Sequence, residues 1–122
     1  SLDYTMSCAS IDRYSSGFLL QKQNIQWYFD NYFQNGEDRQ KASPLFMDIT
    51  PNFPDTLVVT AGFCPLRDEG QTYVQNLHKQ GVRVEHIHFP DMIHAFLNME
   101  RLFPDRIQEL YTALQAFLKN AD

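Results

Sequence analysis

A cysteine and a histidine stand in two short apolar segments that each follow a run rich in β-branched residues. Cys64 follows residues 56–61, and His94 follows residues 82–89. An imidazole titrates near neutral pH and is the usual general base, while a thiol beside an imidazole can become a nucleophile. In open α/β sheets, catalytic groups gather past the carboxyl ends of the strands. We therefore expect Cys64 and His94 to meet, although thirty residues separate them.

Both residues also have a plainer interpretation. His94 lies in the apolar segment 92–96, where a lone histidine is commonly a core residue with satisfied hydrogen bonds. Free cysteine is often a small buried hydrophobe, and we favour this interpretation of Cys64 over an activated thiol. A Cys64–His94 nucleophile pair is a third interpretation, because an imidazole can activate a thiol.

His86 and His88 raise the question of a metal site. Side chains at i and i+2 of a strand point the same way, so this pair could share a zinc ion. A solvent-facing pair on an edge strand is the simpler interpretation, and we favour it. We therefore expect no metal site and no cofactor.

Two runs predict strands and three apolar stripes predict helices. Residues 56–61 are apolar on both faces and stop at Gly62, which is typical of a strand in a parallel sheet; a second strand closes at Pro90. Apolar spacings of three and four indicate helices, and the aromatic stripe of the first is interpreted as core. The predicted strands are residues 56–61 and 82–89, the helices 20–33, 68–80 and 104–118, and the loops 1–18 and 37–55.

This alternation of helices and strands predicts an α/β fold with parallel strands. Two or three parallel strands with flanking helices do not complete a sheet, because parallel sheets need several strands with both faces covered. The pattern therefore predicts one edge of a larger sheet.

The composition of the chain argues against nucleic-acid-binding, membrane-spanning and disulfide-rich proteins. The chain has 122 residues, 43% of them hydrophobic, and a formal net charge of -5. An acidic chain argues against nucleic acid as a partner, and no apolar run approaches the roughly 20 residues of a membrane span. Two cysteines are too few for a disulfide scaffold, so we expect reduced thiols and a cytoplasmic protein.

Several segments together resemble one family. Residues 59–70 read VTAGFCPLRDEG and residues 92–96 read MIHAF. They are similar to the G-x-D-P-L-x-D-x-G and x-x-H-G-F segments of the hormone-sensitive-lipase-like esterases, within the α/β-hydrolase fold. Ser43-Pro44-Leu45 and Ser1-Leu2-Asp3 resemble further family segments in the same order. The resemblance implies that residues 1–122 are the C-terminal segment of a single α/β-hydrolase domain.

The resemblance assigns roles to three residues. His94 matches the general base of a Ser-Asp-His triad, and Cys64 stands where the family has the aspartate that orients the base. Asp68 matches the second aspartate of the motif, and we expect it to cap the helix that follows. Arg67, Asp68 and Glu69 are otherwise interpreted as a solvated helix start.

The nucleophile has no counterpart in this chain. The fold places its serine on a G-x-S-x-G turn with an oxyanion loop upstream, and the five glycines here have no such spacing. The resemblance implies a serine carboxylesterase that cleaves short-chain esters, of which this segment alone is inactive. The alternative is a non-catalytic α/β-hydrolase-like binding protein, disabled at the acid position. We expect strand edges made for the missing portion to be covered by that portion or by another copy of the chain.

Overall fold

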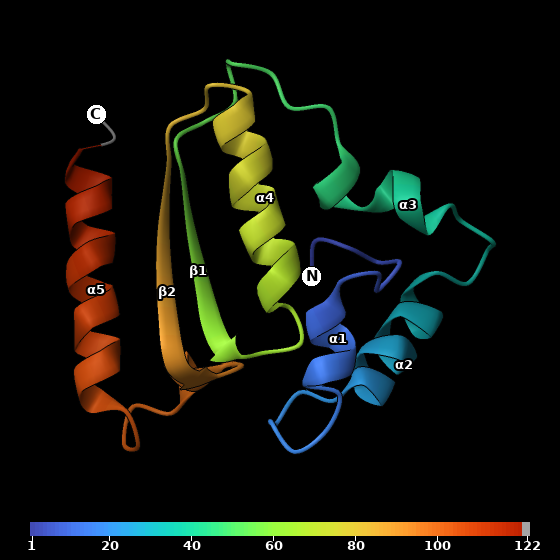
Figure 1. Cartoon of the computed structure of the whole chain (residues 1–122), viewed down its shortest axis with the longest axis horizontal. Helices are drawn as coiled ribbons and strands as arrows, with labels where there is room; N and C mark the ends of the chain where they lie inside the picture. The colour runs from blue at the N-terminus through green and yellow to red at the C-terminus, as the bar shows by residue number, and fades with distance from the viewer. Residues whose placement is uncertain (121–122) are drawn as a thin grey trace.

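The computed structural model describes residues 1–120 as a two-stranded parallel sheet with helices around it (Figure 1). The elements in chain order are α1 (Ala9–Arg13), α2 (Lys22–Tyr32), α3 (Arg39–Ala42), the 3₁₀ turn η1 (Pro44–Phe46), β1 (Thr56–Phe63), α4 (Arg67–Lys79), β2 (Val84–Ile93), the 3₁₀ turn η2 (Phe96–Asn98) and α5 (Pro104–Lys119). The predicted fold class, an incomplete α/β sheet with flanking helices, is confirmed.

The two predicted strands pair in parallel, from Thr56 opposite Val84 to Ala61 opposite Phe89. Their predicted ends are wrong. β1 continues past Gly62 to Phe63, and β2 continues through Pro90 to Ile93. Proline lacks an amide hydrogen and is tolerated at a bulge, and the register shifts at this point. Pro90 therefore marks an irregularity in the strand and not its end.

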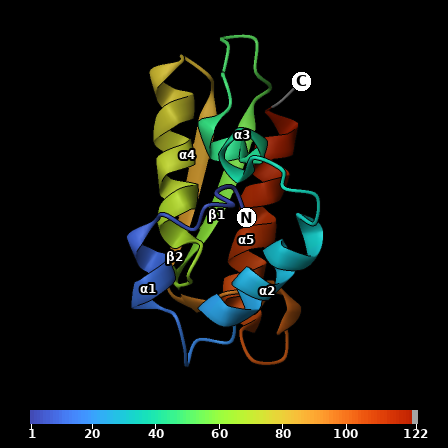
Figure 2. The same cartoon turned by 90° about the vertical axis from the view of Figure 1, so that its right-hand side faces the viewer.

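The alternation of side chains along the strands divides the core between two helices. Val84 packs in one cluster with Tyr73 and Leu77 of α4. Phe89 packs in another with Ile107 and Leu110 of α5. Because successive side chains of a strand point to opposite faces, α4 and α5 cover opposite faces of the sheet (Figures 1 and 2). A helix thus covers each face of the sheet, as the apolar runs indicated.

Two segments predicted as loops contain short helices. Residues 1–18 include α1, and residues 37–55 include α3 and η1. Helices this short are not stable on their own, so their sequences need no long apolar stripe. Packing stabilises α1, whose Ser10 and Ile11 are buried. Within residues 1–120, no helix is long and apolar enough to span a bilayer.

The aromatic stripe of α2 is only half buried, which corrects its interpretation as core. Ile25 and Phe29 pack with Ile11, whereas Tyr28 and Tyr32 are 54% and 76% exposed. One side of this helix therefore presents aromatic rings to solvent.

Candidate active site

Cys64 and His94 meet, as the parallel topology predicts. Cys64 directly follows β1 and His94 directly follows β2, so both lie past the carboxyl edge of the sheet. The Cys64 Sγ atom lies 3.3 Å from His94 Nδ1, within hydrogen-bonding distance for sulfur. The contact joins two loops that are remote in sequence and adjacent in the sheet.

A bulge in β2 brings His94 to this position. After Ala61 pairs with Phe89, the next pair is Phe63 with Ile93, so one residue of β1 faces three of β2. The residue of β1 at this point is Gly62, whose place leaves no room for a side chain: a Cβ atom there would lie 2.0 Å from the Pro90 carbonyl oxygen. The glycine therefore permits the close approach of two backbones that the bulge requires.

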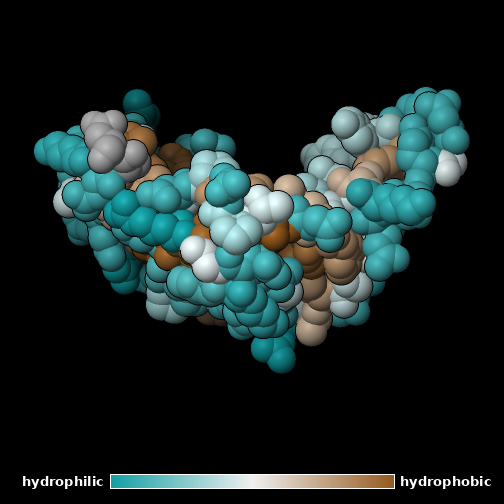
Figure 3. Space-filling view, turned by 90° about the horizontal axis from the view of Figure 1, so that it is seen from above, coloured by the Kyte–Doolittle hydropathy of each residue, from teal (hydrophilic) through white to brown (hydrophobic). Residues whose placement is uncertain are grey.

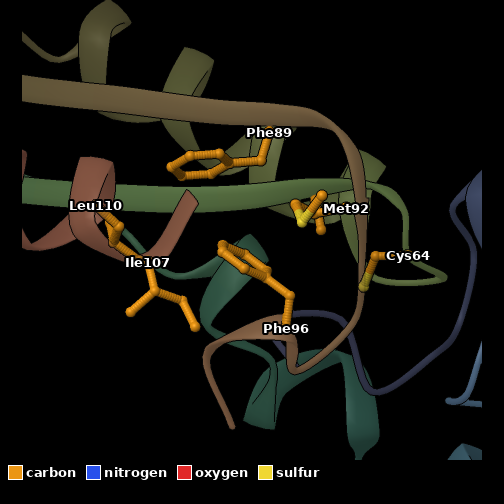
Figure 4. Close-up of a cluster of buried hydrophobic side chains, with 7 residues drawn as sticks. Cys64, Phe89, Met92, Phe96, Ile107 and Leu110 are labelled. Carbon is orange, nitrogen blue, oxygen red and sulfur yellow. The ribbon is translucent and has the colours of Figure 1, made fainter. Parts of the chain in front are cut away.

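The bulge is hydrogen-bonded to α5, and the chain turns sharply just after His94. Arg106 of α5 donates two hydrogen bonds to Asp91 Oδ2, at 2.8 and 3.1 Å. Ala95, the residue after His94, has a left-handed backbone with φ 59°. A residue with a Cβ pays roughly 1–2 kcal/mol for this conformation. The turn directs Phe96 into the core, where it is 3% exposed (Figure 4).

Cys64 is buried in apolar surroundings. It is 6% exposed and belongs to the cluster that contains Phe89, Met92 and Phe96 (Figure 4). Burial raises the pKa of the Cys64 thiol, and a hydrogen bond from the Leu66 amide to Sγ, 3.4 Å long, only partly opposes this. The interpretation of Cys64 as a buried residue is confirmed, and it has an imidazole contact as well.

His94 is half-buried, and burial lowers the pKa of its imidazole. A lowered imidazole pKa and a raised thiol pKa both favour uncharged groups. The Cys64–His94 pair is therefore neutral near pH 7, and a thiolate–imidazolium pair is disfavoured.

Asp68 caps a different helix from the one predicted. Its carboxylate accepts a hydrogen bond from the Ser10 backbone amide, 2.9 Å away, in the first turn of α1. The Ser10 hydroxyl in turn accepts a hydrogen bond from the Asp68 amide and donates one to the Pro65 carbonyl oxygen, 2.6 Å away. These reciprocal hydrogen bonds fix α1 to the loop that carries Cys64. The Ser10 hydroxyl also caps the first turn of α4, whose N-cap residue Leu66 offers no side-chain hydrogen bond.

Glu69 is the residue near this site that sequence reasoning missed. It was predicted to be solvated, but it is 2% exposed, and its carboxylate accepts from the Leu2 amide at 2.6 Å and from the Ser1 hydroxyl at 3.1 Å. Burial raises the pKa of its carboxyl group. Its spacing to Tyr73 and Leu77, which are four and eight residues on, places it on the buried stripe of α4 and could have revealed it.

A groove of about 340 Å³ connects these groups. We call it the β1 groove, and its walls include Cys64, His94, Glu69, Leu2 and residues 58–61. Four consecutive residues of β1 and none of β2 line it, so it follows the edge of β1 that faces away from β2. Seen from the other end of the sheet, apolar side chains also reach the surface among polar ones (Figure 3).

The pair His86 and His88 converges on a threonine. Thr60 Oγ1 lies 2.8 Å from His86 Nε2 and 2.9 Å from His88 Nδ1. Both histidines are exposed on β2, the edge position that was expected, but their rings turn toward β1. Among the residues described, no group of three or more potential ligands could hold a metal ion.

Comparison with known proteins identifies the family. The model of an alpha/beta hydrolase fold family matches residues 2–98. The chain is 32% identical over 122 residues to carboxylic ester hydrolase LipN of Mycobacterium tuberculosis, a match that covers 95% of this chain and 32% of that protein. It is 30% identical over 109 residues to ethyl acetate hydrolase of Pseudomonas putida, covering 88% of this chain and 34% of the relative.

Solved structures agree with this result. The hyperthermophilic esterase of the archaeon Pyrobaculum calidifontis superposes with a TM-score of 0.85 at 31% identity, over 98% of this chain and 40% of that one. The chain spans about a third of the length of the curated relatives it matches. The resemblance to esterases is confirmed. Since the family match extends over most of its residues and an esterase backbone follows it almost end to end, this chain belongs to the alpha/beta hydrolase fold family.

Proposed function

We propose that this chain is the C-terminal segment of an α/β-hydrolase domain that cleaves short-chain carboxylic esters. His94 is the general base, and Cys64 takes the place of the triad's acid. The observation that carries the proposal is the 3.3 Å contact between Cys64 Sγ and His94 Nδ1 at the carboxyl edge of the sheet. The relatives named as ester hydrolases support the class of reaction.

The sequence of this chain determines which steps of the proposed reaction its own residues can carry out. His94 Nε2 takes the proton of a serine hydroxyl and returns it to the leaving alcohol. The serine and the oxyanion loop belong to the N-terminal part of the domain, because no G-x-S-x-G sequence occurs here. The 122-residue chain alone is therefore expected to be inactive.

Cys64 limits the rate that this arrangement can reach. A thiol accepts hydrogen bonds weakly and, when neutral, supplies no charge to stabilise the imidazolium that forms. Replacing the acid of a serine-protease triad by a neutral group lowers kcat about 10⁴-fold. This effect, together with the burial that raises the pKa of Cys64, favours the second candidate, a non-catalytic relative that binds a ligand or a protein.

Ester hydrolysis by the full-length protein tests the two candidates. Native protein and the Cys64→Asp variant are assayed with a short-chain p-nitrophenyl ester, beside His94→Gln and a control, His78→Gln, on the exposed side of α4. We expect weak hydrolysis by the native protein, faster hydrolysis by Cys64→Asp, loss with His94→Gln and no change with His78→Gln. Hydrolysis by Cys64→Asp alone would identify the native protein as the non-catalytic relative.

We also propose that the free edge of β1 is an interface. Residues 58–61 line the β1 groove, and the part of the chain that the structure describes places no strand on that side. An uncovered strand edge pairs readily with another chain. We expect the N-terminal part of the domain to cover it, and a second copy to do so when the 122-residue chain is isolated. Sedimentation velocity should then show a dimer or larger species, whereas a stable monomer at micromolar concentration contradicts this.

A further inference from the structure

The hydrogen-bonding partners of the Cys64 thiol determine where its hydrogen can point. Among the residues described, Sγ has two hydrogen-bonding partners: the Leu66 amide at 3.4 Å and His94 Nδ1 at 3.3 Å. A backbone amide hydrogen can only be donated, so Leu66 cannot accept the thiol hydrogen. Within residues 1–120, His94 Nδ1 is therefore the one acceptor in contact with this thiol, whose side chain is 6% exposed.

The charges around Cys64 keep this hydrogen in place. Burial disfavours the thiolate, and the carboxylate of Glu69 disfavours it further. Arg67, the cationic side chain of the same loop, acts in the opposite direction on the pKa of Cys64, but more weakly than burial or Glu69, and its guanidinium hydrogen-bonds to other groups. It donates to Asp68 Oδ1 and to the Tyr14 hydroxyl, both at 2.8 Å, and to the Gly62 carbonyl oxygen at 3.3 Å.

We propose that Cys64 donates its S–H to His94 Nδ1 and thereby holds the imidazole in the tautomer that carries its proton on Nε2. In the opposite arrangement Nδ1–H would donate to sulfur, and the buried thiol hydrogen would lose the acceptor that the described residues give it. An unpaired buried polar group costs more than a weak hydrogen bond returns, and an imidazole nitrogen is a better acceptor than a thiol sulfur.

This tautomer is the reverse of the one that triad chemistry uses. An aspartate accepts Nδ1–H, so Nε2 is left without a hydrogen and can take the proton of a serine. With Cys64 as the donor, Nε2 carries the hydrogen at rest, and the ring must change tautomer before it can act as a base. This consequence rests on the role proposed above for His94, whereas the tautomer itself does not.

Nitrogen NMR of the histidine rings tests the inference directly. The chain has four histidines, so selective ¹⁵N labelling gives four ring systems, which single His→Gln variants assign. At a pH above the imidazole titration, we expect Nδ1 of His94 to be unprotonated and Nε2 to be protonated. His78, exposed on α4, should show the averaged signals of a free imidazole and serves as the control.

Substitutions at Cys64 show whether the hydrogen-bond donor itself, and not simply a side chain at this position, sets the tautomer of His94. Cys64→Ser keeps a hydrogen-bond donor and should preserve the tautomer. Cys64→Ala removes the donor, so the ring nitrogens of His94 should show signals averaged over the two tautomers. Cys64→Asp should move the proton to Nδ1. If the aspartate variant does not fold, the serine and alanine variants carry the test. A proton on Nδ1 in the native chain, or no change in Cys64→Ala, overturns the inference. Neither result decides whether the full-length protein hydrolyses esters, which the assay above measures separately.

Discussion

Cys64 and the aspartate of the family motif differ in charge, and we propose that they take the same place beside the base. Cys64 occupies the loop after β1 and reaches His94 Nδ1, as an orienting acid must. A neutral thiol and a neutral imidazole can be buried together without the cost of desolvating an ion pair. The same neutrality removes the negative charge that would stabilise an imidazolium. The pair is therefore compatible with a stable fold but poorly suited to fast proton transfer.

The reactivity of the two cysteines checks this description of the thiol. Burial, with nearby carboxylates, raises the pKa of Cys8 from 9.0 to about 11, so its thiolate fraction at neutral pH falls about a hundredfold. Burial also raises the pKa of Cys64. We expect iodoacetamide to label both cysteines far more slowly in the folded chain than in urea, as measured by peptide mass spectrometry. Labelling of Cys64 at the rate seen in urea would instead indicate an activated thiol.

At the scale of elements, local patterns predicted the strands, while tertiary packing decided the details of the site. The β-branched runs and the rule for parallel strands were enough to bring Cys64 and His94 together. The bulge was not predictable, because Pro90 ordinarily signals the end of a strand and only the pairing partner shows otherwise. The hydrogen bonds between Ser10 and Asp68 were equally unpredictable, since they join residues 58 positions apart.

Gly62→Ala tests the fit between the strands at the bulge. The new Cβ would meet the Pro90 backbone, 2.0 Å from its oxygen and 2.5 Å from its carbonyl carbon, and neither strand can yield without disturbing the pairing. We expect the free energy of unfolding in urea to fall by roughly 1–3 kcal/mol or more.

Gly36→Ala is the matched control, because Gly36 has φ 74° but nothing within 4 Å of its Cβ position. Its cost should be that of the left-handed backbone alone, roughly 1–2 kcal/mol. If Gly62→Ala proves no more destabilising than this control, the close approach of the two strands is not essential to the fold.

At the scale of the whole molecule, the chain holds the proposed base, His94, and the residue proposed at the acid position, Cys64, whereas its sequence has no G-x-S-x-G turn for a nucleophile. It spans about a third of the length of the curated relatives it matches, and within residues 1–120 no strand pairs with the outer edge of β1. The β1 groove lies along that edge and includes Cys64 and His94 in its walls. The proposed chemistry therefore needs a partner element beside β1, and its measurement belongs to the full-length protein.

A double-mutant cycle on the full-length protein is the most direct test of the claim that Cys64 and His94 act as one unit in ester hydrolysis. The value of kcat/KM for a short-chain p-nitrophenyl ester is measured for the native protein, Cys64→Asp, His94→Gln and the double variant. Residues that act as a unit are strongly non-additive. We predict that Cys64→Asp raises kcat/KM by up to about 10⁴-fold when His94 is present, and has no effect when it is replaced. An equal gain in both backgrounds, or no gain in either, would contradict the proposed base and acid positions.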